Sequence, residues 1–327
     1  MRRGVVARLA ALGAALLLVG CALPPQTRAL TDAPPTGVPV RTELASVPFF
    51  PQTAYHCGPA ALSTALGAAG FTAQPDELAP QVYLPSRQGS LQVEMLAGAR
   101  RQGALAVRLP PTLHAVLEEL AGGHPVVVLQ NLGLSFAPGW HYAVVIGHDL
   151  EAGTLLLRSG TVERQVLSLA TFENTWARGG HWAFVALPPG HLPVSATENE
   201  VAAATVALER SVAPAAARRA YDAALARWPG NLTLAIGAGN SRHAAGDLAG
   251  AAEVFEAASA LHDSAPAWIN LAAVRLEQGQ AKAAEGAARR AVARAAGDTA
   301  WQAIADETLA KVLAAQPQPT SVRRRTR

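Results

Sequence analysis

Runs of β-branched residues occur only before residue 201 of this 327-residue chain, and alanine dominates from residue 201 onward. Segments 124–130 and 139–147 are rich in β-branched residues and are typical of buried strands. No such run follows residue 201, so this part is predicted to be all helix. Hydrophobic residues make up 50% and charged residues 16% of the chain, which is enough to bury a core. We therefore predict an α+β domain followed by an all-α domain.

Proline and glycine mark the boundaries between these parts. Five prolines fall between residues 22 and 43, where apolar periodicity is weak, and they predict an extended tether. The sequence Leu-Pro-Pro-Gly at 187–190 is a natural domain end. The predicted divisions are a tether (21–43), an α+β domain (44–190), a linker (191–200), a helical domain (201–316) and a basic disordered tail (317–327).

Residues 1–20 have the layout of a secretory signal, with a basic start, an apolar run and small residues before Cys21. The sequence Leu18-Val19-Gly20-Cys21 resembles the lipoprotein box of bacteria. The resemblance implies cleavage before Cys21, acylation of its thiol and membrane anchoring without a span. Because Ala22 follows rather than aspartate, it also implies the outer membrane, facing the periplasm. An ordinary signal peptide with a chance cysteine is the alternative.

The second cysteine, Cys57, stands at the predicted start of a helix. Apolar residues at three- and four-residue spacing follow it: Leu62, Ala65, Leu66 and Ala69. Pro59 suits a first turn and Gly70 suits the end. The dipole and free N–H groups at a helix start lower a thiol pKa, and a thiolate is a competent nucleophile. The alternative is an inert buried cysteine.

Gln52 lies five positions before Cys57, where its amide can donate a hydrogen bond to an oxyanion. Gly58 allows a substrate to approach the backbone closely. Gln52 together with Cys57-Gly58-Pro59-Ala60-Ala61-Leu62 resembles the nucleophile motif of the double-glycine leader peptidases, the papain-like family that processes bacteriocins. The resemblance covers about residues 44–190. It implies a helix that carries the nucleophile, packed against an antiparallel sheet, and a Cys57 thiolate that attacks an amide carbonyl.

A papain-like site needs a histidine base on a later strand. His141 begins the strand pattern 139–147, beside a loop that contains glycine and proline. The family carries Gly-His-Tyr or a similar triplet here, and in this chain Trp140 replaces the glycine. His56 is interpreted as a loop or subsite residue. His148 lies in a turn and is predicted on the strand face opposite His141. His181 is a weaker rival for the base, and a partly buried surface histidine is the simpler interpretation.

The third member of the site departs from the family, which carries aspartate or asparagine, often in Asn-Asp-Pro, at the end of the next strand. A hairpin centred near Glu151 puts Ser159 opposite His141. A serine hydroxyl can orient an imidazole but cannot stabilise imidazolium as a carboxylate does. Other possible orienting groups are Asp149, Asn131 and Asn174.

The helical part shows a period near 34 residues. Three pairs of residues are 34 apart: Tyr221 and Phe255, Ala224 and Ala258, and Leu234 and Trp268. This spacing resembles the tetratricopeptide repeat, with about two clear repeats and weaker flanking helices. The resemblance implies a surface that docks a peptide or protein partner. A plain alanine-rich helical bundle is the alternative.

The leading hypothesis is a membrane-anchored, extracytoplasmic cysteine peptidase of the bacterial cell envelope, with repeats that dock a substrate or partner. The missing carboxylate motivates a second hypothesis, a catalytically weak peptidase fold that acts as a binding module. An amidase or acyltransferase of the same fold is a third. No metal-ligand cluster, phosphate loop or dinucleotide fingerprint occurs in the sequence, so no cofactor is expected. The excess positive charge sits mainly at the two ends, so no nucleic-acid partner is expected.

Overall fold

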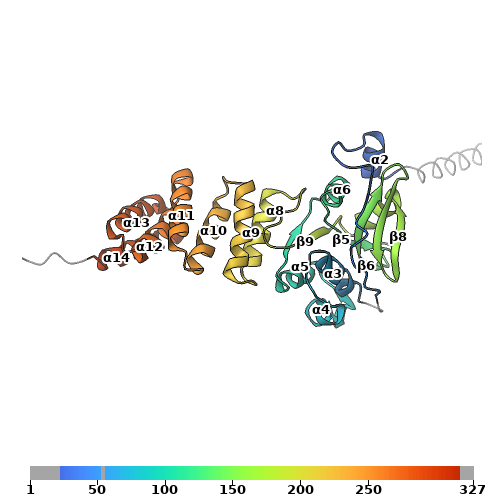
Figure 1. The fold of residues 1–327 in the computed structure, drawn as a ribbon, viewed down its shortest axis with the longest axis horizontal. Coiled ribbons are helices and arrows are strands. Elements are labelled where there is room, and N and C mark those ends of the chain that lie inside the picture. The colour runs from blue at the N-terminus through green and yellow to red at the C-terminus, as the bar shows by residue number, and fades with distance from the viewer. Residues whose placement is uncertain (1–22, 53–55, 317–327) are drawn as a thin grey trace, which may run out of the picture. The chain divides into compact units, whose positions relative to one another are not determined.

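The computed structural model describes residues 23–52 and 56–316 (Figure 1). The predicted signal (1–20), the predicted acylation site at Cys21 and the predicted basic tail (317–327) lie outside this part of the chain. The described chain forms two compact units, divided near residue 187, with residues 193–197 joining the first unit. Within the described residues, no helix combines the length and apolar character needed to cross a membrane.

The first unit is built on an antiparallel sheet of seven strands in the described residues, with the order β4-β9-β5-β6-β7-β8 and β1 paired to one end of β6. A separate small hairpin joins β2 (Tyr83–Leu84) to β3 (Gly89–Ser90). The strands of the large sheet are β1 (Arg41–Glu43), β4 (Leu105–Arg108), β5 (Val126–Asn131), β6 (Trp140–Asp149), β7 (Thr154–Ser159), β8 (Val162–Ser168) and β9 (Ala183–Leu187).

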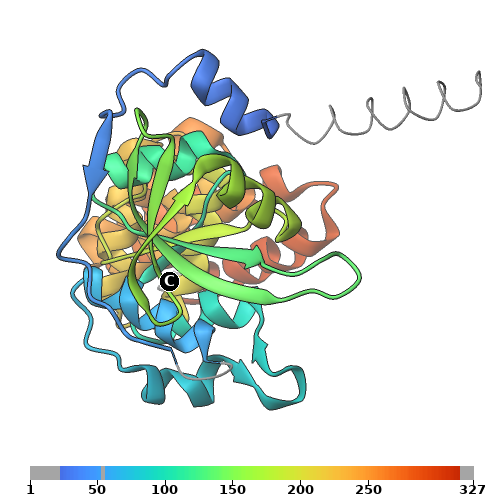
Figure 2. The same ribbon diagram turned by 90° about the vertical axis from the view of Figure 1, so that its right-hand side faces the viewer.

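Helices cover both faces of this sheet, so β5 is buried along its whole length (Figures 1 and 2). On one face lie α3 (Cys57–Ala68), α4 (Pro75–Val82) and α5 (Gln92–Arg101), whose apolar side chains share one core with alternate residues of β5, β6 and β9. On the other face lie α6 (Leu113–Ala121) and α7 (Leu169–Arg178). The prediction of an extended tether over residues 21–43 is wrong for much of that segment, which contains the helix α2 (Pro25–Asp32) and the strand β1.

The helix predicted after Cys57 is confirmed as α3, which begins at Cys57 and ends just before Gly70. Gly70 has a φ of +84°, a left-handed conformation that glycine adopts without a steric penalty. Leu62 and Leu66 point from α3 into the core shared with β6. This packing fixes the N-terminus of α3 against the sheet, and with it the position of Cys57.

The second unit consists of helix pairs whose starting points repeat along the chain. Alternate helices begin at residues 198, 232, 265 and 299, with spacings of 34, 33 and 34, and the helices between them begin at 214, 248 and 281. These intervals are those of a tetratricopeptide-type array. The helices are α8 (Glu198–Glu209), α9 (Pro214–Arg227), α10 (Leu232–Ala244), α11 (Leu248–His262), α12 (Ala265–Glu277), α13 (Ala281–Ala295) and α14 (Thr299–Ala314).

Large rings fit against helical glycines inside this array. A Cβ atom added to Gly237 would overlap the ring of Tyr221, and one added to Gly239 would overlap the ring of Phe255. Both rings are buried. The glycines therefore let α10 approach its neighbours α9 and α11 more closely than any larger residue would.

The same substitution at two helical glycines should change stability in opposite directions. Gly237→Ala should lower the free energy of unfolding by about 1–3 kcal/mol, because the new methyl group displaces the Tyr221 ring. Gly286 lies in α13 with open space around it, so Gly286→Ala should raise the free energy of unfolding by up to about 1 kcal/mol through helix propensity alone. Urea titrations of both variants measure the difference. Equal effects would contradict the packing described.

Candidate active site

Cys57 is the first residue of α3, and its side chain faces the start of β6. The backbone N–H groups of Tyr142, Gly58 and Cys57 itself lie within hydrogen-bonding reach of its sulfur. Tyr142 is the residue next to His141 on β6. The fold therefore brings the predicted nucleophile to the residue that follows the predicted base, although 84 positions separate Cys57 and His141 in the sequence (141 − 57).

Burial raises the pKa of the Cys57 thiol, and the three backbone N–H donors only partly offset that rise. The sequence analysis expected a lowered thiol pKa from the helix start alone, and this expectation is wrong in direction. The sulfur sits among core residues of α3 and the sheet, where loss of hydration disfavours the thiolate. At rest the nucleophile is therefore a neutral thiol.

His141 contacts Ser159 across the β6–β7 pair. The distance from His141 Nε2 to Ser159 Oγ is 2.9 Å. The strand register sets Arg158 opposite Val144, so Ser159 lies one position closer to the start of β6. Burial lowers the pKa of His141, because the charged imidazolium is poorly hydrated there. With Nε2 engaged by Ser159, Nδ1 is the ring nitrogen that can receive a proton.

Gln52 reaches the same position from the chain that precedes α3. Its side-chain Nε2 donates to the carbonyl oxygen of Tyr142 at 3.4 Å, and its backbone N–H donates to the carbonyl oxygen of Gly160 at 3.1 Å. These bonds hold Gln52 between the start of β6 and the end of β7. All four residues predicted for the catalytic site thus meet around Tyr142 and Ser159.

Arg158 is a positioning residue that the sequence analysis did not single out. Its guanidinium is buried and donates to the carbonyl oxygens of Ala45, Val47 and Glu163, with distances from 2.6 to 3.2 Å. Hydrogen bonds of this kind satisfy a buried cation without a carboxylate. They tie the segment that leads to Gln52 onto β7, beside Ser159.

Gly58 has a packing role in addition to the one expected from sequence. A Cβ atom at this position would overlap the side chain of Ser90 on β3. The Tyr142 hydroxyl donates to the carbonyl oxygen of Ser90 at 3.1 Å. The β2–β3 hairpin is therefore held against the start of α3 on one side and against β6 on the other.

The other candidates for the orienting group are engaged elsewhere. Asp149 pairs with Arg41 at the far end of β6, with an Nε–Oδ2 distance of 2.8 Å. The Asn131 side-chain oxygen accepts from the N–H groups of two loop glycines. Asn174 is exposed on α7. Ser159 is therefore the candidate that contacts His141.

The remaining histidines near the sheet have structural contacts. His56 packs edge-on against Tyr83, with ring centroids 5.1 Å apart. His148 bonds through Nε2 to the carbonyl oxygen of Pro39 at 2.8 Å. His181 packs edge-on against Trp176. Within residues 23–52 and 56–316, the structure holds no cluster of three His, Cys, Asp or Glu side chains suited to a metal ion.

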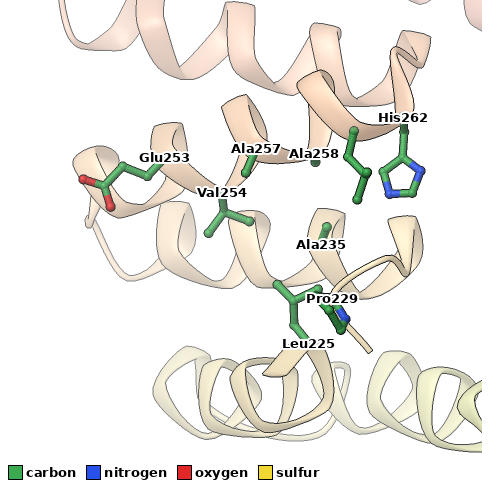
Figure 3. A pocket seen from close by; sticks show the side chains of 9 residues that line it. Leu225, Pro229, Ala235, Glu253, Val254, Ala257, Ala258 and His262 are labelled. Carbon is green, nitrogen blue, oxygen red and sulfur yellow. The ribbon is translucent and has the colours of Figure 1, made fainter. Parts of the chain in front are cut away.

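The helical repeats carry a surface pocket of about 250 Å³ between α9, α10 and α11 (Figure 3). Its walls are mainly apolar, with Glu253 at one end and His262 at the other. The Nε2 atom of His262 is buried and has no hydrogen-bond partner among the described residues. Pro229 belongs to the turn between α9 and α10 and forms part of the wall.

Residues 44–183 match the model of the Peptidase_C39 like family, so the first unit contains a C39-like domain. A search of curated proteins finds no match. Among solved structures, a Bacillus anthracis protein described as a C39-like peptidase is 18% identical, with a TM-score of 0.38; the match covers 45% of this chain and 97% of that one.

Two further solved structures resemble the helical part. The Yersinia enterocolitica type III secretion chaperone SycD, in complex with a peptide of the translocator YopD, is 14% identical with a TM-score of 0.34, over 36% of this chain and 92% of that one. The Sgt2 TPR domain of Aspergillus fumigatus is 20% identical with a TM-score of 0.32, over 38% of this chain and 87% of that one.

The pH dependence of Cys57 alkylation follows from the raised thiol pKa. In a Cys21→Ser background, the iodoacetamide labelling rate should fall about tenfold per pH unit below the ordinary thiol range. The lowered pKa of His141 reduces the fraction of imidazolium that could sustain a thiolate at acid pH. The rate is measured by mass spectrometry between pH 5 and 10. A plateau of rapid labelling at pH 5–6 would instead indicate a preformed thiolate–imidazolium pair.

Proposed function

We propose that the first unit is a cysteine peptidase that cleaves peptide bonds, with Cys57 as nucleophile and His141 as base. The observation that carries this proposal is the position of the Cys57 sulfur at the N–H group of Tyr142, the residue that follows His141 on β6. A nucleophile within reach of a base that is oriented by a third group is the arrangement needed for acyl transfer. The family match over residues 44–183 supports the same reaction class.

The neutral resting state of the Cys57 thiol determines the proposed first step. As the Cys57 sulfur attacks the amide carbonyl, its proton passes to His141 Nδ1, and a sulfur–carbon bond forms. The Cys57 backbone N–H and the Gln52 amide, turned from the Tyr142 carbonyl, stabilise the negative oxygen that results.

His141 then protonates the departing amine, and the carbon–nitrogen bond breaks. Water, deprotonated by His141, attacks the thioester and releases the acid while the thiol regains its proton. Ser159 holds the ring in position throughout through its 2.9 Å contact with Nε2. Because a hydroxyl carries no charge, it stabilises imidazolium less than a carboxylate would, and we expect slow turnover.

The proposal extends to location and partners. Cys21 would anchor the protein to the outer membrane, facing the periplasm, which rests on the resemblance of residues 18–21 to a lipoprotein box. The helical repeats would dock a protein partner or the substrate. The pocket between α9 and α11 supports this role, since its apolar walls can accept an apolar side chain of a bound peptide (Figure 3).

A binding module with the same fold is the second candidate, favoured by the raised thiol pKa and by serine at position 159. An amidase or acyltransferase that uses the same residues is a third. The three candidates differ in whether peptide bonds are hydrolysed, whether Cys57 is needed, and whether a small acyl acceptor replaces water.

Substitutions at three of the site residues, assayed with a library of peptides, test the peptidase proposal. Cys57→Ala should abolish cleavage, and His141→Ala should lower kcat/KM by about 10²–10⁴-fold. Ser159→Asp should raise kcat by ~10-fold, because a carboxylate near Nε2 raises the pKa of His141 and stabilises imidazolium. Cleavage products are identified by mass spectrometry.

Ser159→Ala is the matched control for Ser159→Asp, since it removes the hydroxyl without adding charge. It should lower kcat with little change in KM. If no library peptide is cleaved in a Cys57-dependent way, even by Ser159→Asp, the binding-module candidate replaces the peptidase. Transfer of the acyl group to an added amine, in preference to water, would favour the acyltransferase.

A further inference from the structure

The turn between β5 and β6 exposes large apolar side chains next to the candidate active site. The exposed fractions are 86% for Phe136, 59% for Leu134, 56% for Trp140 and 55% for Leu132. We call these four residues the apolar tip. Single exposed apolar residues are ordinary, but four within nine positions, with no charged residue between 131 and 140, form a concentrated apolar surface.

The backbone of this turn is held in a defined shape. The Asn131 side-chain oxygen accepts from the N–H groups of Gly133 and Gly139 at 3.0 and 2.9 Å. Leu134 and Ala137 exchange two backbone hydrogen bonds of 3.1 Å. A Cβ atom at Gly133 would overlap the Ala137 carbonyl, so glycine is required there. The turn is thus built to keep the apolar tip outside the core, and the hairpin projects beyond the sheet (Figure 2).

Helix α7 fixes both this hairpin and the start of the described chain. The Arg178 guanidinium donates to the Asn131 carbonyl oxygen at 2.8 and 3.1 Å, at the base of the hairpin. The Glu173 carboxylate accepts from the backbone N–H groups of Gln26 and Thr27 at 2.9 and 2.6 Å. Five residues separate 173 and 178 (178 − 173), which is about 7.5 Å along a helix axis.

Cys21 lies only four residues before Pro25, where α2 begins, so the intervening chain spans at most about 14 Å. A membrane that held Cys21 would therefore lie close to α7 and to the hairpin attached to it.

We propose that the apolar tip inserts into the interfacial layer of a lipid bilayer, as a second membrane contact beside the anchor at Cys21. The inference rests on the anchor of the proposed function for its geometry, but not on peptidase activity. Uncharged loops that carry aromatic and aliphatic side chains suit the interface, where Trp in particular is enriched. Two weak membrane contacts together give stable attachment where one is marginal.

The contact also specifies where the candidate active site would work. Trp140 belongs to the apolar tip and is followed directly by His141. Insertion of the tip therefore sets the Cys57–His141 pair at the membrane surface. Its substrates would then be peptide segments that emerge from the membrane or lie on it.

Vesicle flotation tests the contact without acylation or catalysis. The chain from residue 21 onward, carrying Cys21→Ser and Cys57→Ala, is mixed with vesicles of phosphatidylethanolamine and phosphatidylglycerol. Leu134→Ser combined with Phe136→Ser should lower the vesicle-bound fraction about tenfold or more, because two large apolar side chains no longer insert. The matched control combines Val93→Ser with Leu261→Ser, at residues 64% and 62% exposed, and should leave the bound fraction unchanged.

A second measurement guards against a folding defect in the double variant. Phe136→Cys, in the same background and labelled with an environment-sensitive fluorophore, should shift its emission to the blue when vesicles are added. The same label at Leu261→Cys should not shift. Absence of vesicle binding, or equal binding by the tip variant and its control, would overturn the proposal.

The competing role for the apolar tip is contact with an apolar peptide substrate. Cleavage of soluble peptides is compared in the chain with Cys57 intact. If the tip variant loses cleavage while its vesicle binding is unchanged, the tip is a substrate surface and the membrane proposal is wrong. If cleavage is absent in every variant but vesicle binding depends on the tip, the peptidase proposal fails while the membrane contact stands.

Discussion

The packing of α3 against β6 is the interaction on which the candidate site depends. Leu62 and Leu66 bury one side of α3 in the sheet core, and this sets the N-terminus of the helix at the level of Tyr142. The Tyr142 N–H then faces the Cys57 sulfur, while its carbonyl oxygen accepts from Gln52. A shift of α3 by one helical turn, about 5.4 Å, would separate the thiol from the Tyr142 N–H group. The chemistry of the site is therefore a consequence of apolar packing some distance away from it.

Local patterns, together with the family resemblance, were sufficient to propose candidate residues for the site, but not to predict their electrostatics. Helix spacing, strand alternation and hairpin symmetry placed Cys57, His141 and Ser159 on their elements, and each of these patterns depends on neighbours along the chain. The thiol pKa depends on how much water the fold excludes, and the core around Cys57 includes residues from distant strands. Arg158 could not be singled out for the same reason, since it donates to carbonyls more than 110 positions away.

In the helical repeats, too, some features could be recognised from the sequence and others only from the structure. Tyr221 and Phe255 made the period visible because each is the large member of a ring–glycine contact with α10. The pair α8–α9 was harder to recognise as a repeat from the sequence. Helix α8 has no aromatic side chain, and its buried residues include the small Ala204 and Thr205. Its place in the array is clear only from helix starting points, with α8 beginning 34 residues before α10 (232 − 198).

A neutral thiol beside an uncharged orienting group would make a slow enzyme for substrates in free solution. A surface that holds enzyme and substrate together changes this limit, because the encounter becomes effectively intramolecular. The proposed anchor, the apolar tip and the repeats would all raise the local concentration of substrate at Cys57, none of them by changing the chemistry at sulfur. Burial of the thiol weakens its activation but also protects it. A neutral Cys57 in the proposed periplasmic location would be less readily oxidised than an exposed thiolate. The weak activation of the Cys57 thiol would therefore be offset by the high local concentration of substrate that these attachments provide.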